Sequence, residues 1–385
     1  MPEVKRIGVL TGGGDSPGIN SALRAIVRRA HAVGIEVIGF RDGWLGPLKA
    51  EEEGYAIPLS LQDVSGILYT GGTILGTSRT NPFRKEKKGQ SWQRVDWEGK
   101  SVWKLVKEAD WQPTDKVSTI VDNLGRLGID ALIAIGGDDT LGVAHRLAQQ
   151  GVRLVGIPQT IDNDIGGTDY AIGFHSALVT VTDALDKLHT TAHAHHRVLI
   201  VEVMGRDSGW IAVYGGLAGG ADVILVPEGP PEGSFSVDEV EQVIRRRLEQ
   251  DKRFSIVVVA EGARPRELGG KQVERGGVDA FGNPQLGGVG YWLAEELQKR
   301  DLPLTPRVTV LAYLQRGGIA TPFDRLLATE FGVKAVELVR KGVYDVLTGL
   351  RGNRVQPVPL AEALAQCPKP VDPELLQVAQ SIGIG

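Results

Sequence analysis

The chain has 385 residues, of which 42% are hydrophobic and 23% are charged, and its formal net charge at pH 7 is −4. This length favours two domains or one large α/β unit, and the composition is that of a soluble globular protein. Because the chain lacks an overall positive charge, nucleic acid and anionic membranes are not expected as partners, and any anionic ligand would need locally placed arginines.

The sequence has no apolar run long enough to cross a bilayer. Its first residues, MPEVKRIGVL, lead directly into a strand-like pattern without the apolar core of a signal peptide. We therefore expect a cytoplasmic protein. The single cysteine, Cys367, excludes an intramolecular disulfide and any metal cage made of several cysteines.

Short β-branched runs alternate with segments of helical periodicity along most of the chain. In chain order, the expected strands are RIGVL, DALIAI, RLVGIP, RVLIVEVM, FSIVVVAEG and RVTVLAYL. Helical segments such as GINSALRAIVRRAHAVG and TLGVAHRLAQQG separate them. This alternation predicts βαβ units and parallel sheets covered by helices.

Two segments depart from this pattern. Residues 85–115 are rich in Lys, Glu and Gln and lie in a stretch that carries four tryptophans, which indicates an inserted surface element, a hairpin with a short helix. After about residue 351, the Pro-rich stretch VQPVPLAEALAQCPKPVDPELL indicates a tail that docks on the rest of the protein.

A strand, a glycine turn and a helix start follow one another in VLTGGGDSPGIN, residues 9–20. Three consecutive glycines would let backbone N–H groups converge on a phosphate at the start of the helix. The stretch is not a P-loop, because no GK[ST] follows, and Pro17 breaks the dinucleotide-binding fingerprint. A plain tight turn between strand and helix is an equally good interpretation of this stretch alone.

A second glycine-rich stretch, GGTILGTSRTNPFR at residues 71–84, carries Arg79 and Arg84. Arginine beside a phosphate cradle can bridge two phosphoryl groups and stabilise the charge of their transfer. A solvated surface arginine is the commoner case, so this stretch by itself decides nothing.

Two acidic turns follow two of the expected strands. Asp138 and Asp139 stand side by side in AIGGDDTLG, and Asp162 and Asp164 stand two apart in IPQTIDNDIGGTDYAIG. In an extended segment, side chains two apart point the same way, so one carboxylate could accept a proton while the other contacts a metal. The DND stretch alone favours an Asx turn that caps the next helix. Together, the two turns favour metal-assisted phosphoryl transfer at the ends of neighbouring parallel strands.

Further polar groups stand beside glycines at later strand ends. Arg206, Glu261, Arg307 and Arg316 occur in VMGRDSGW, AEGAR and PRVTVLAYLQRGG, and together they could hold a sugar phosphate. Capping and turn chemistry are the alternative interpretation. The histidine-rich HTTAHAHHR, residues 189–197, lacks a carboxylate–histidine metal signature, so we interpret it as a polar interface segment and retain only Arg197.

In this order, TGGGDSPG, GGTILGTSR, GGDDT, TIDND, VMGR and QRGG closely resemble the 6-phosphofructokinase family, from about Arg6 to Leu350. The GGDDT turn alone would also suit NAD kinases and lipid kinases. TIDND followed by QRGG distinguishes the 6-phosphofructokinase family from these two groups. The resemblance implies a Mg²⁺-dependent phosphotransferase that makes fructose 1,6-bisphosphate from fructose 6-phosphate in glycolysis.

The resemblance also implies site residues, position by position. Asp162 would be the base that deprotonates the 1-hydroxyl of fructose 6-phosphate, and Asp138 would bind Mg²⁺ with Asp164 nearby. Thr160 and Arg206 would contact the transferring group. The donor would be held by Gly14, Arg79, Gly137, Asp139, Thr140 and Gln159. The sugar phosphate would be held by Met204, Gly205, Glu261, Tyr313 and Arg316, with Arg197 and Arg307 from a neighbouring subunit.

The implied fold is two α/β domains with parallel sheets and the active site in the cleft between them. Residues 1–173 and 315–365 would form the phosphoryl-donor domain, with the insert at about 85–115. Residues 174–314 and 366–385 would form the sugar-phosphate domain. The shared arginines imply a homo-oligomer, a dimer or a tetramer.

Asp139 and Gln159 bear on the identity of the donor. Family members that use ATP commonly have glycine where Asp139 stands, because a carboxylate there would repel the α-phosphate and take up its space. Aspartate at position 139 makes this chain similar to the pyrophosphate-dependent members, but these usually carry lysine where Gln159 stands. Pyrophosphate is therefore the predicted donor and ATP the second.

Two functions of other classes fit the sequence less well. A catalytically silent sugar-phosphate regulator would need neither base nor metal, so the presence of Asp138, Asp162 and Arg206 together argues against it. An NAD(H) oxidoreductase is disfavoured by the broken glycine fingerprint.

Overall fold

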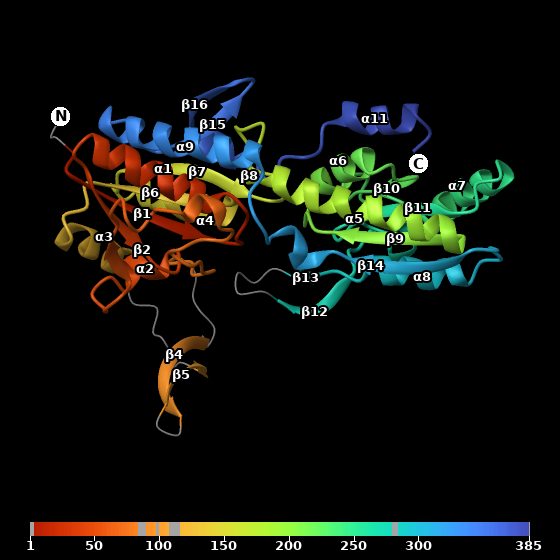
Figure 1. Cartoon of the computed structure of the whole chain (residues 1–385), viewed down its shortest axis with the longest axis horizontal. Helices are drawn as coiled ribbons and strands as arrows, with labels where there is room; N and C mark the ends of the chain where they lie inside the picture. Colours follow the sequence, from red (N-terminus) through yellow and green to blue (C-terminus); the bar gives the residue numbers. More distant parts are fainter. Residues whose placement is uncertain (1–3, 84–89, 98–99, 108–115, 279–283, 385) are drawn as a thin grey trace.

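The structure is a computed structural model that describes residues 4–83, 90–97, 100–107, 116–278 and 284–384. The described elements form two lobes, each with its own sheet (Figure 1). Among these residues, no helix combines the length and the apolar character that spanning a membrane requires.

The first lobe contains a sheet with eight strands in its described part, in the order β16-β15-β7-β6-β1-β2-β3, with β8 paired to β7. The central strands β2, β1, β6, β7 and β15 run parallel, whereas β3 and β16 are antiparallel edges. The strands are β1 (Arg6–Gly12), β2 (Glu36–Phe40), β3 (Ala56–Pro58), β6 (Ala131–Gly136), β7 (Leu154–Thr160), β8 (Ile172–Gly173), β15 (Val346–Arg351) and β16 (Arg354–Pro359).

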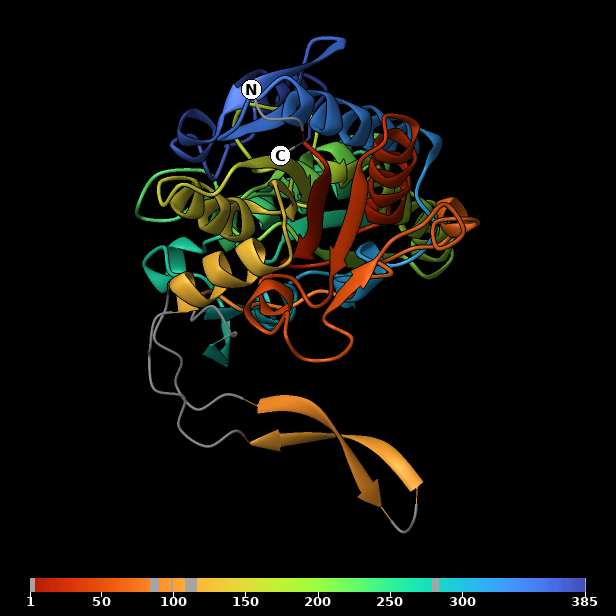
Figure 2. The same cartoon turned by 90° about the vertical axis from the view of Figure 1, so that its left-hand side faces the viewer.

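Helices cover both faces of this sheet. On one face α1 (Ile19–Ala32) and α9 (Pro322–Arg340) lie side by side (Figure 2) and share a core with strand residues such as Ile7 and Ile133. The other face packs against α2 (Leu45–Leu48), α3 (Lys116–Arg126), α4 (Asp138–Ala148) and α10 (Leu360–Leu364). Thr321 starts α9 by accepting the Asp324 N–H, with Pro322 in the first turn, where a missing N–H costs nothing.

The second lobe contains a smaller, fully parallel sheet, whose described strands have the order β10-β11-β9-β14. Residues such as Leu199 and Val201 face one side of β9, and Val198 and Ile200 face the other, and all four are buried in the core. The strands are β9 (Arg197–Val203), β10 (Val223–Leu225), β11 (Ser255–Ala260) and β14 (Thr305–Val310).

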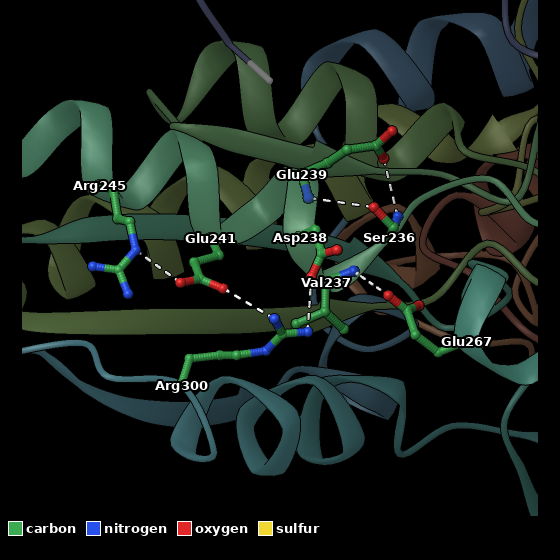
Figure 3. Close-up of polar contacts among 8 residues, drawn as sticks. All are labelled: Ser236, Val237, Asp238, Glu239, Glu241, Arg245, Glu267 and Arg300. Carbon is green, nitrogen blue, oxygen red and sulfur yellow. Dashed lines mark hydrogen bonds and ion pairs between the residues drawn. The ribbon is translucent and has the colours of Figure 1, made fainter.

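The helices of the second lobe also lie on two faces. One layer consists of α5 (Phe174–His195), α6 (Trp210–Ala218) and α11 (Pro373–Ser381), and the other of α7 (Val237–Glu249) and α8 (Val289–Gln298). A capping box begins α7, because Ser236 Oγ accepts the Glu239 N–H while the Glu239 carboxylate accepts the Ser236 N–H (Figure 3). Arg300, just after α8, pairs with Asp238 and Glu241 and ties the two helices together (Figure 3).

Short elements complete the chain. They are the single turns η1 (Ile67–Tyr69), η2 (Arg266–Leu268) and η3 (Ala312–Gln315), and the antiparallel pairs β4 (Gln90–Trp97) with β5 (Lys100–Lys107) and β12 (Glu274–Val278) with β13 (Pro284–Leu286). The hairpin expected in the insert is therefore present. The rest of the insert, including Trp111, and also Arg84 lie outside the described residues.

The predicted α/β class with two parallel-strand sheets is confirmed. The Pro-rich C-terminal stretch is only partly a docking tail, because its first part is the edge strand β16, which the proline content had concealed. The chain passes between the lobes after β8, between β14 and α9, and between α10 and α11 (Figure 1).

Candidate active site

The glycine turn and both acidic turns meet at one edge of the first sheet. Gly12 at the end of β1 pairs with Gly136 at the end of β6, and Gly136 pairs with Pro158 of β7. Because these strands are parallel neighbours, the segments that leave their carboxyl ends emerge together. TGGGDSPG, GGDDT and TIDND therefore share one site, as the sequence predicts.

Close packing of backbone explains two of the glycines. A Cβ atom on Gly12 would lie 2.8 Å from Thr140 Oγ1, and one on Gly136 would lie 2.6 Å from Thr140 Cβ. The buried Thr140 side chain of α4 thus fills the space between the two strand ends. Gly137 precedes α4 in an extended conformation, so the first N–H groups of this helix are at the site edge.

The loop that carries Arg79 is joined to the first glycine turn. Gly13 N–H donates to Ser78 O at 3.2 Å, and Thr77 Oγ1 donates to Gly13 O at 2.6 Å. The second glycine-rich stretch therefore lies beside the first. Arg79 itself is exposed.

Gln159 connects the glycine turn to the acidic strand end. Its Nε2 donates to Gly14 O at 3.1 Å and to Ser16 Oγ at 2.8 Å. Its Oε1 is buried and has no hydrogen-bond partner among the described residues. Gly14 also touches the Arg316 guanidinium, since a Cβ there would lie 2.4 Å from Nη1. A ligand that donates a hydrogen bond would satisfy the free Gln159 oxygen.

Three carboxylates act on one another electrostatically. Burial raises the pKa of Asp162, an effect that Arg316 and Arg206 oppose and Asp138 increases. Burial also raises the pKa of Asp164 well above its usual range, and the charges of Asp162 and Asp138 add to this. Asp162 Oδ1 is buried without a hydrogen-bond partner among the described residues. A carboxylate with a raised pKa binds a proton more readily than an ordinary aspartate, which suits a general base.

The DND segment is a turn and not the extended segment assumed from its spacing. Asn163 has a left-handed backbone, with φ of 52°. Its side chain accepts the Ala171 N–H at 2.9 Å and donates to Asp169 O at 3.1 Å. These contacts reach eight and six residues ahead, whereas an Asx turn bonds two residues ahead, so the Asx-turn interpretation does not hold for this residue. Thr160 Oγ1 accepts the Asp162 N–H at 3.1 Å. The turn, and not strand alternation, brings Asp162 and Asp164 together.

The second lobe contributes its own strand ends. Val203, the last residue of β9, pairs with Ala260 of β11, so Met204, Gly205 and Glu261 are neighbours. Arg206 has a left-handed backbone and donates its N–H to Glu261 Oε1 at 3.2 Å. Burial raises the pKa of Glu261 to about 7, and the negative charge of Asp162 adds to the shift. Glu261 therefore exchanges its proton in the physiological range.

A small cavity of about 90 Å³ lies between these strand ends and η3. Met204, Glu261 and the exposed Tyr313 are among its lining residues. Arg316 follows η3 and donates to Asp15 O at 3.2 Å, which joins this region to the glycine turn of the first lobe. The predicted donor and sugar residues therefore come together from both lobes.

Arg197 and Arg307 lie elsewhere. Arg197 begins β9, whereas Met204 follows its end, and a seven-residue strand spans about 20 Å. Arg307 is exposed in β14, opposite Leu199 near the start of β9. These two arginines are near each other and remote from the other sugar residues of the same chain. Next to them, the histidine-rich segment ends α5, where His189 Nε2 lies 2.7 Å from Gly219 O.

Sequence reasoning missed several residues that organise the site. Ser208 Oγ donates to Asp162 O at 3.2 Å, and the fully buried Gln315 accepts the Met204 N–H at 3.3 Å. Both residues stand inside the motifs VMGRDSGW and QRGG, but the sequence analysis assigned roles only to other residues of these motifs. Buried amides and hydroxyls beside a charged site are the signal that could have found them.

The oxygen-rich surroundings of Asp138 suit Mg²⁺, which takes one or two carboxylates and completes its shell with water and substrate phosphates. Asp138 lies in the exposed first turn of α4, and its charge acts on both Asp162 and Asp164. In the part of the chain that the structure describes, no three His, Cys, Asp or Glu side chains form a ready metal cluster. Asp138, with Asp164 nearby, therefore suits a magnesium site completed by a substrate phosphate. It does not suit a site in which the protein supplies all the metal ligands.

Known proteins match this chain over nearly its whole length. The family model described as Phosphofructokinase matches residues 6–339. A "Pyrophosphate--fructose 6-phosphate 1-phosphotransferase" from Amycolatopsis methanolica is 48% identical over 97% of this chain and 98% of that protein. An "ATP-dependent 6-phosphofructokinase" from Chloroflexus aurantiacus is 43% identical over 99% of this chain and 97% of that protein.

A solved structure agrees with these sequence matches. The phosphofructokinase from Saccharomyces cerevisiae superposes with a TM-score of 0.74 at 32% identity, covering 98% of this chain, which spans 46% of the yeast chain. Because the superposition covers nearly the whole chain, the structural similarity extends over both lobes. The sequence matches and the structural match agree, and the chain belongs to the phosphofructokinase family.

Proposed function

We propose that the protein transfers a phosphoryl group from pyrophosphate to the 1-hydroxyl of fructose 6-phosphate, giving fructose 1,6-bisphosphate and phosphate in glycolysis. The observation that carries this proposal is the Asp138–Asp139 pair in the first turn of α4, electrostatically coupled through Asp138 to the buried oxygen of Asp162. The names of relatives such as the Amycolatopsis methanolica protein support pyrophosphate as the donor.

Asp162 is the proposed general base. Its carboxylate accepts the proton of the sugar 1-hydroxyl while the hydroxyl oxygen attacks the phosphorus atom and the bond to the leaving phosphate breaks. Arg206 is close enough to act on the charge of Asp162, and we assign to it and to Thr160 the stabilisation of the transferring group. Mg²⁺, held by Asp138 with Asp164 nearby, would neutralise charge on the donor phosphates.

The donor side is assigned to the first lobe. Backbone N–H groups at the start of α4 suit phosphate oxygens, and Gln159 offers polarity without charge. We assign donor binding to Gly14, Arg79, Gly137, Asp139, Thr140 and Gln159. We propose residues 1–173 and 315–365 as this domain and residues 174–314 and 366–385 as the sugar-phosphate domain.

The sugar phosphate is assigned to the second lobe and to a second copy of the chain. Met204, Gly205, Glu261, Tyr313 and Arg316 would bind it from one subunit. Because Arg197 and Arg307 are at the opposite end of β9, they would serve the site of a neighbouring subunit. Exposed apolar side chains at Tyr313 (77%), Leu314 (67%) and Ile319 (61%) support a homo-oligomer, a dimer or a tetramer, that covers this surface.

ATP is the second candidate donor. The Chloroflexus aurantiacus relative carries an ATP-dependent name, and Gln159 provides less positive charge than the lysine usual in pyrophosphate-dependent members. A catalytically silent regulator is disfavoured, because it would not need a base with a free buried oxygen. The negative net charge speaks against a nucleic acid partner, and we propose a cytoplasmic location without a membrane partner.

Assaying the pure wild-type protein with each donor tests this proposal. With fructose 6-phosphate and Mg²⁺, we expect a higher kcat/KM for pyrophosphate than for ATP, because Asp139 opposes an α-phosphate by charge and by space. Robust turnover with ATP and none with pyrophosphate would contradict the donor assignment. No turnover with either donor, together with measurable binding of fructose 6-phosphate, would favour the silent regulator.

The shared arginines give a separate prediction. Arg197→Ala and Arg307→Ala should each raise the KM for fructose 6-phosphate by about 10-fold or more, because a charge-assisted hydrogen bond to a phosphate is worth about 1.5–3 kcal/mol. The KM for the donor should change much less. Arg253→Ala, which removes an exposed arginine paired only with Asp251 in the described part of the chain, is the control. An unchanged sugar KM in both variants would refute the shared site.

A further inference from the structure

The chain that joins α10 to α11 crosses from the first lobe to the second beside the site (Figure 1). This connection, residues 366–372, contacts the acidic loop, residues 162–169. It is about 200 residues away from that loop in sequence, and no role in the reaction has been given to it so far.

Lys369 makes the central contacts. Its N–H donates to Asp164 O at 2.6 Å, and its Nζ donates to Thr168 O at 2.8 Å and to Asp169 O at 3.2 Å. The ammonium group lies 5.0 Å from the centre of the Trp210 ring, within cation–π range. Trp210 also donates its indole N–H to Lys369 O at 3.0 Å. Lys369 is thus bonded to the acidic loop on one side and to the start of α6 on the other.

The residues around Lys369 extend the same connection. Cys367 Sγ accepts the Gly166 N–H at 3.3 Å, inside the acidic loop. Val371 N–H donates to Glu228 Oε1 at 3.0 Å, and this oxygen also accepts the Gly209 N–H at 3.0 Å. Gly209 stands three residues after Arg206, in the turn that leads into α6. The connection is therefore bonded to both the Asp162 turn and the Arg206 turn.

A partly buried ammonium group is an expensive way to fill space, because burial disfavours its charged form. Burial lowers the pKa of Lys369 to about 8, although Asp169 and Asp164 oppose the shift. An apolar side chain of similar length would avoid this cost. The ammonium group instead satisfies two carbonyls of the acidic loop and faces the negative charge of Asp164.

We propose that residues 366–372 form a clasp that sets the position of the acidic loop relative to the Arg206 turn, with Lys369 as its positioning residue. The clasp's hydrogen bonds to the acidic loop end on backbone atoms of that loop, and none of its residues is among those assigned to the donor or the sugar. This inference rests on the proposed function, since it concerns the geometry between the base Asp162 and the arginine assigned to the transferring group. A misplacement of about 1 Å between such groups can cost about 100-fold in rate.

Lys369→Met tests the clasp, because methionine keeps most of the stem and removes the charge and the donors. We expect kcat to fall about 10-fold, the lower range for outer contacts that orient a site. The KM for fructose 6-phosphate should change less than about twofold, because the clasp contains none of its proposed ligands and three of them, Glu261, Tyr313 and Arg316, stand on loops other than the two that the clasp joins. Lys369→Arg should keep most of kcat, since a guanidinium group can donate to the same two carbonyls. Lys299→Met, which removes an exposed lysine paired with Glu296, is the matched control.

Hydrogen exchange gives a readout that does not depend on turnover. Amides of residues 162–171 should exchange faster in Lys369→Met than in the wild-type protein and in Lys299→Met, with other segments of the first lobe unchanged. If Lys369→Met does not fold, Trp210→Phe keeps an aromatic ring but loses the N–H bond to Lys369 O, and the same two measurements apply.

Wild-type kcat and wild-type exchange in Lys369→Met would overturn the clasp. An equal loss of kcat in Lys369→Met and Lys369→Arg, with a lowered melting temperature in both, would also overturn it and leave a purely structural contact. If the wild-type protein has no phosphotransferase activity, the proposed function fails, while the exchange measurement still decides whether Lys369 orders the acidic loop.

Discussion

Replacing Asp162 with asparagine is expected to lower kcat by about 10²- to 10⁴-fold, the usual effect of removing a general base. Asparagine has nearly the same shape but cannot accept the proton of the sugar hydroxyl at neutral pH. Removing one of three mutually repelling carboxylates should not destabilise the fold, because burial and Asp138 already disfavour the charge of Asp162. Fructose 6-phosphate should bind with nearly unchanged affinity, which calorimetry can measure.

Asp183→Asn is the matched control for this substitution. Asp183 is an exposed aspartate of α5 that pairs with Lys187 on the same helix, and it has no assigned part in the site. We expect wild-type kcat, binding and melting temperature in this variant. Near-normal turnover in Asp162→Asn would remove Asp162 from the role of base and direct attention to Asp164, whose pKa is also raised.

Asp139→Gly is expected to raise kcat/KM for ATP and to lower it for pyrophosphate, each by about tenfold or more. A like charge next to a phosphate costs several kcal/mol, and each 1.4 kcal/mol corresponds to a factor of about ten. Asp139 lies in the first turn of α4, directly after the residue assigned to Mg²⁺, so a bound donor would extend past it. Steady-state kinetics with both donors measures the change.

Asp139→Asn separates charge from space, because it removes the negative charge and keeps the size of the side chain. If repulsion dominates, Asn and Gly should raise ATP use equally, whereas if crowding dominates only Gly should. Glycine in the first turn of a helix lowers its stability by up to about 1 kcal/mol, so melting temperatures accompany the kinetics. Unchanged donor preference in both variants would mean that Asp139 does not select the donor.

The sequence alone was sufficient for the fold class and for the meeting of three turns at one edge of the first sheet. Its alternation of β-branched and helical segments predicts parallel sheets, and its glycine and acidic turns stand at strand ends. Because parallel strands direct their carboxyl ends to one edge, Gly14, Asp138 and Asp162 were expected together, and β1, β6 and β7 are indeed neighbours. These inferences needed only local periodicity and the chirality of βαβ connections.

The local geometry of the acidic loop needed the tertiary structure. Spacing suggested an extended segment, but Asn163 turns the chain and its amide is bonded to residues six and eight positions ahead. The strand β16 was not predicted either. Its prolines are compatible with an edge strand, but the sequence does not show that this segment pairs with β15.

Only the tertiary structure decided which distant residues surround the site. Gln315 and Met204 are 111 positions apart, and Lys369 and Thr168 are 201 positions apart, yet each pair is bonded. Such bonds depend on where two loops from different strands meet, and this is set by the packing of both lobes and not by any repeat in the chain. The sequence therefore determines which chemical groups stand in the acidic loop, whereas the fold decides that Lys369 is bonded to this loop.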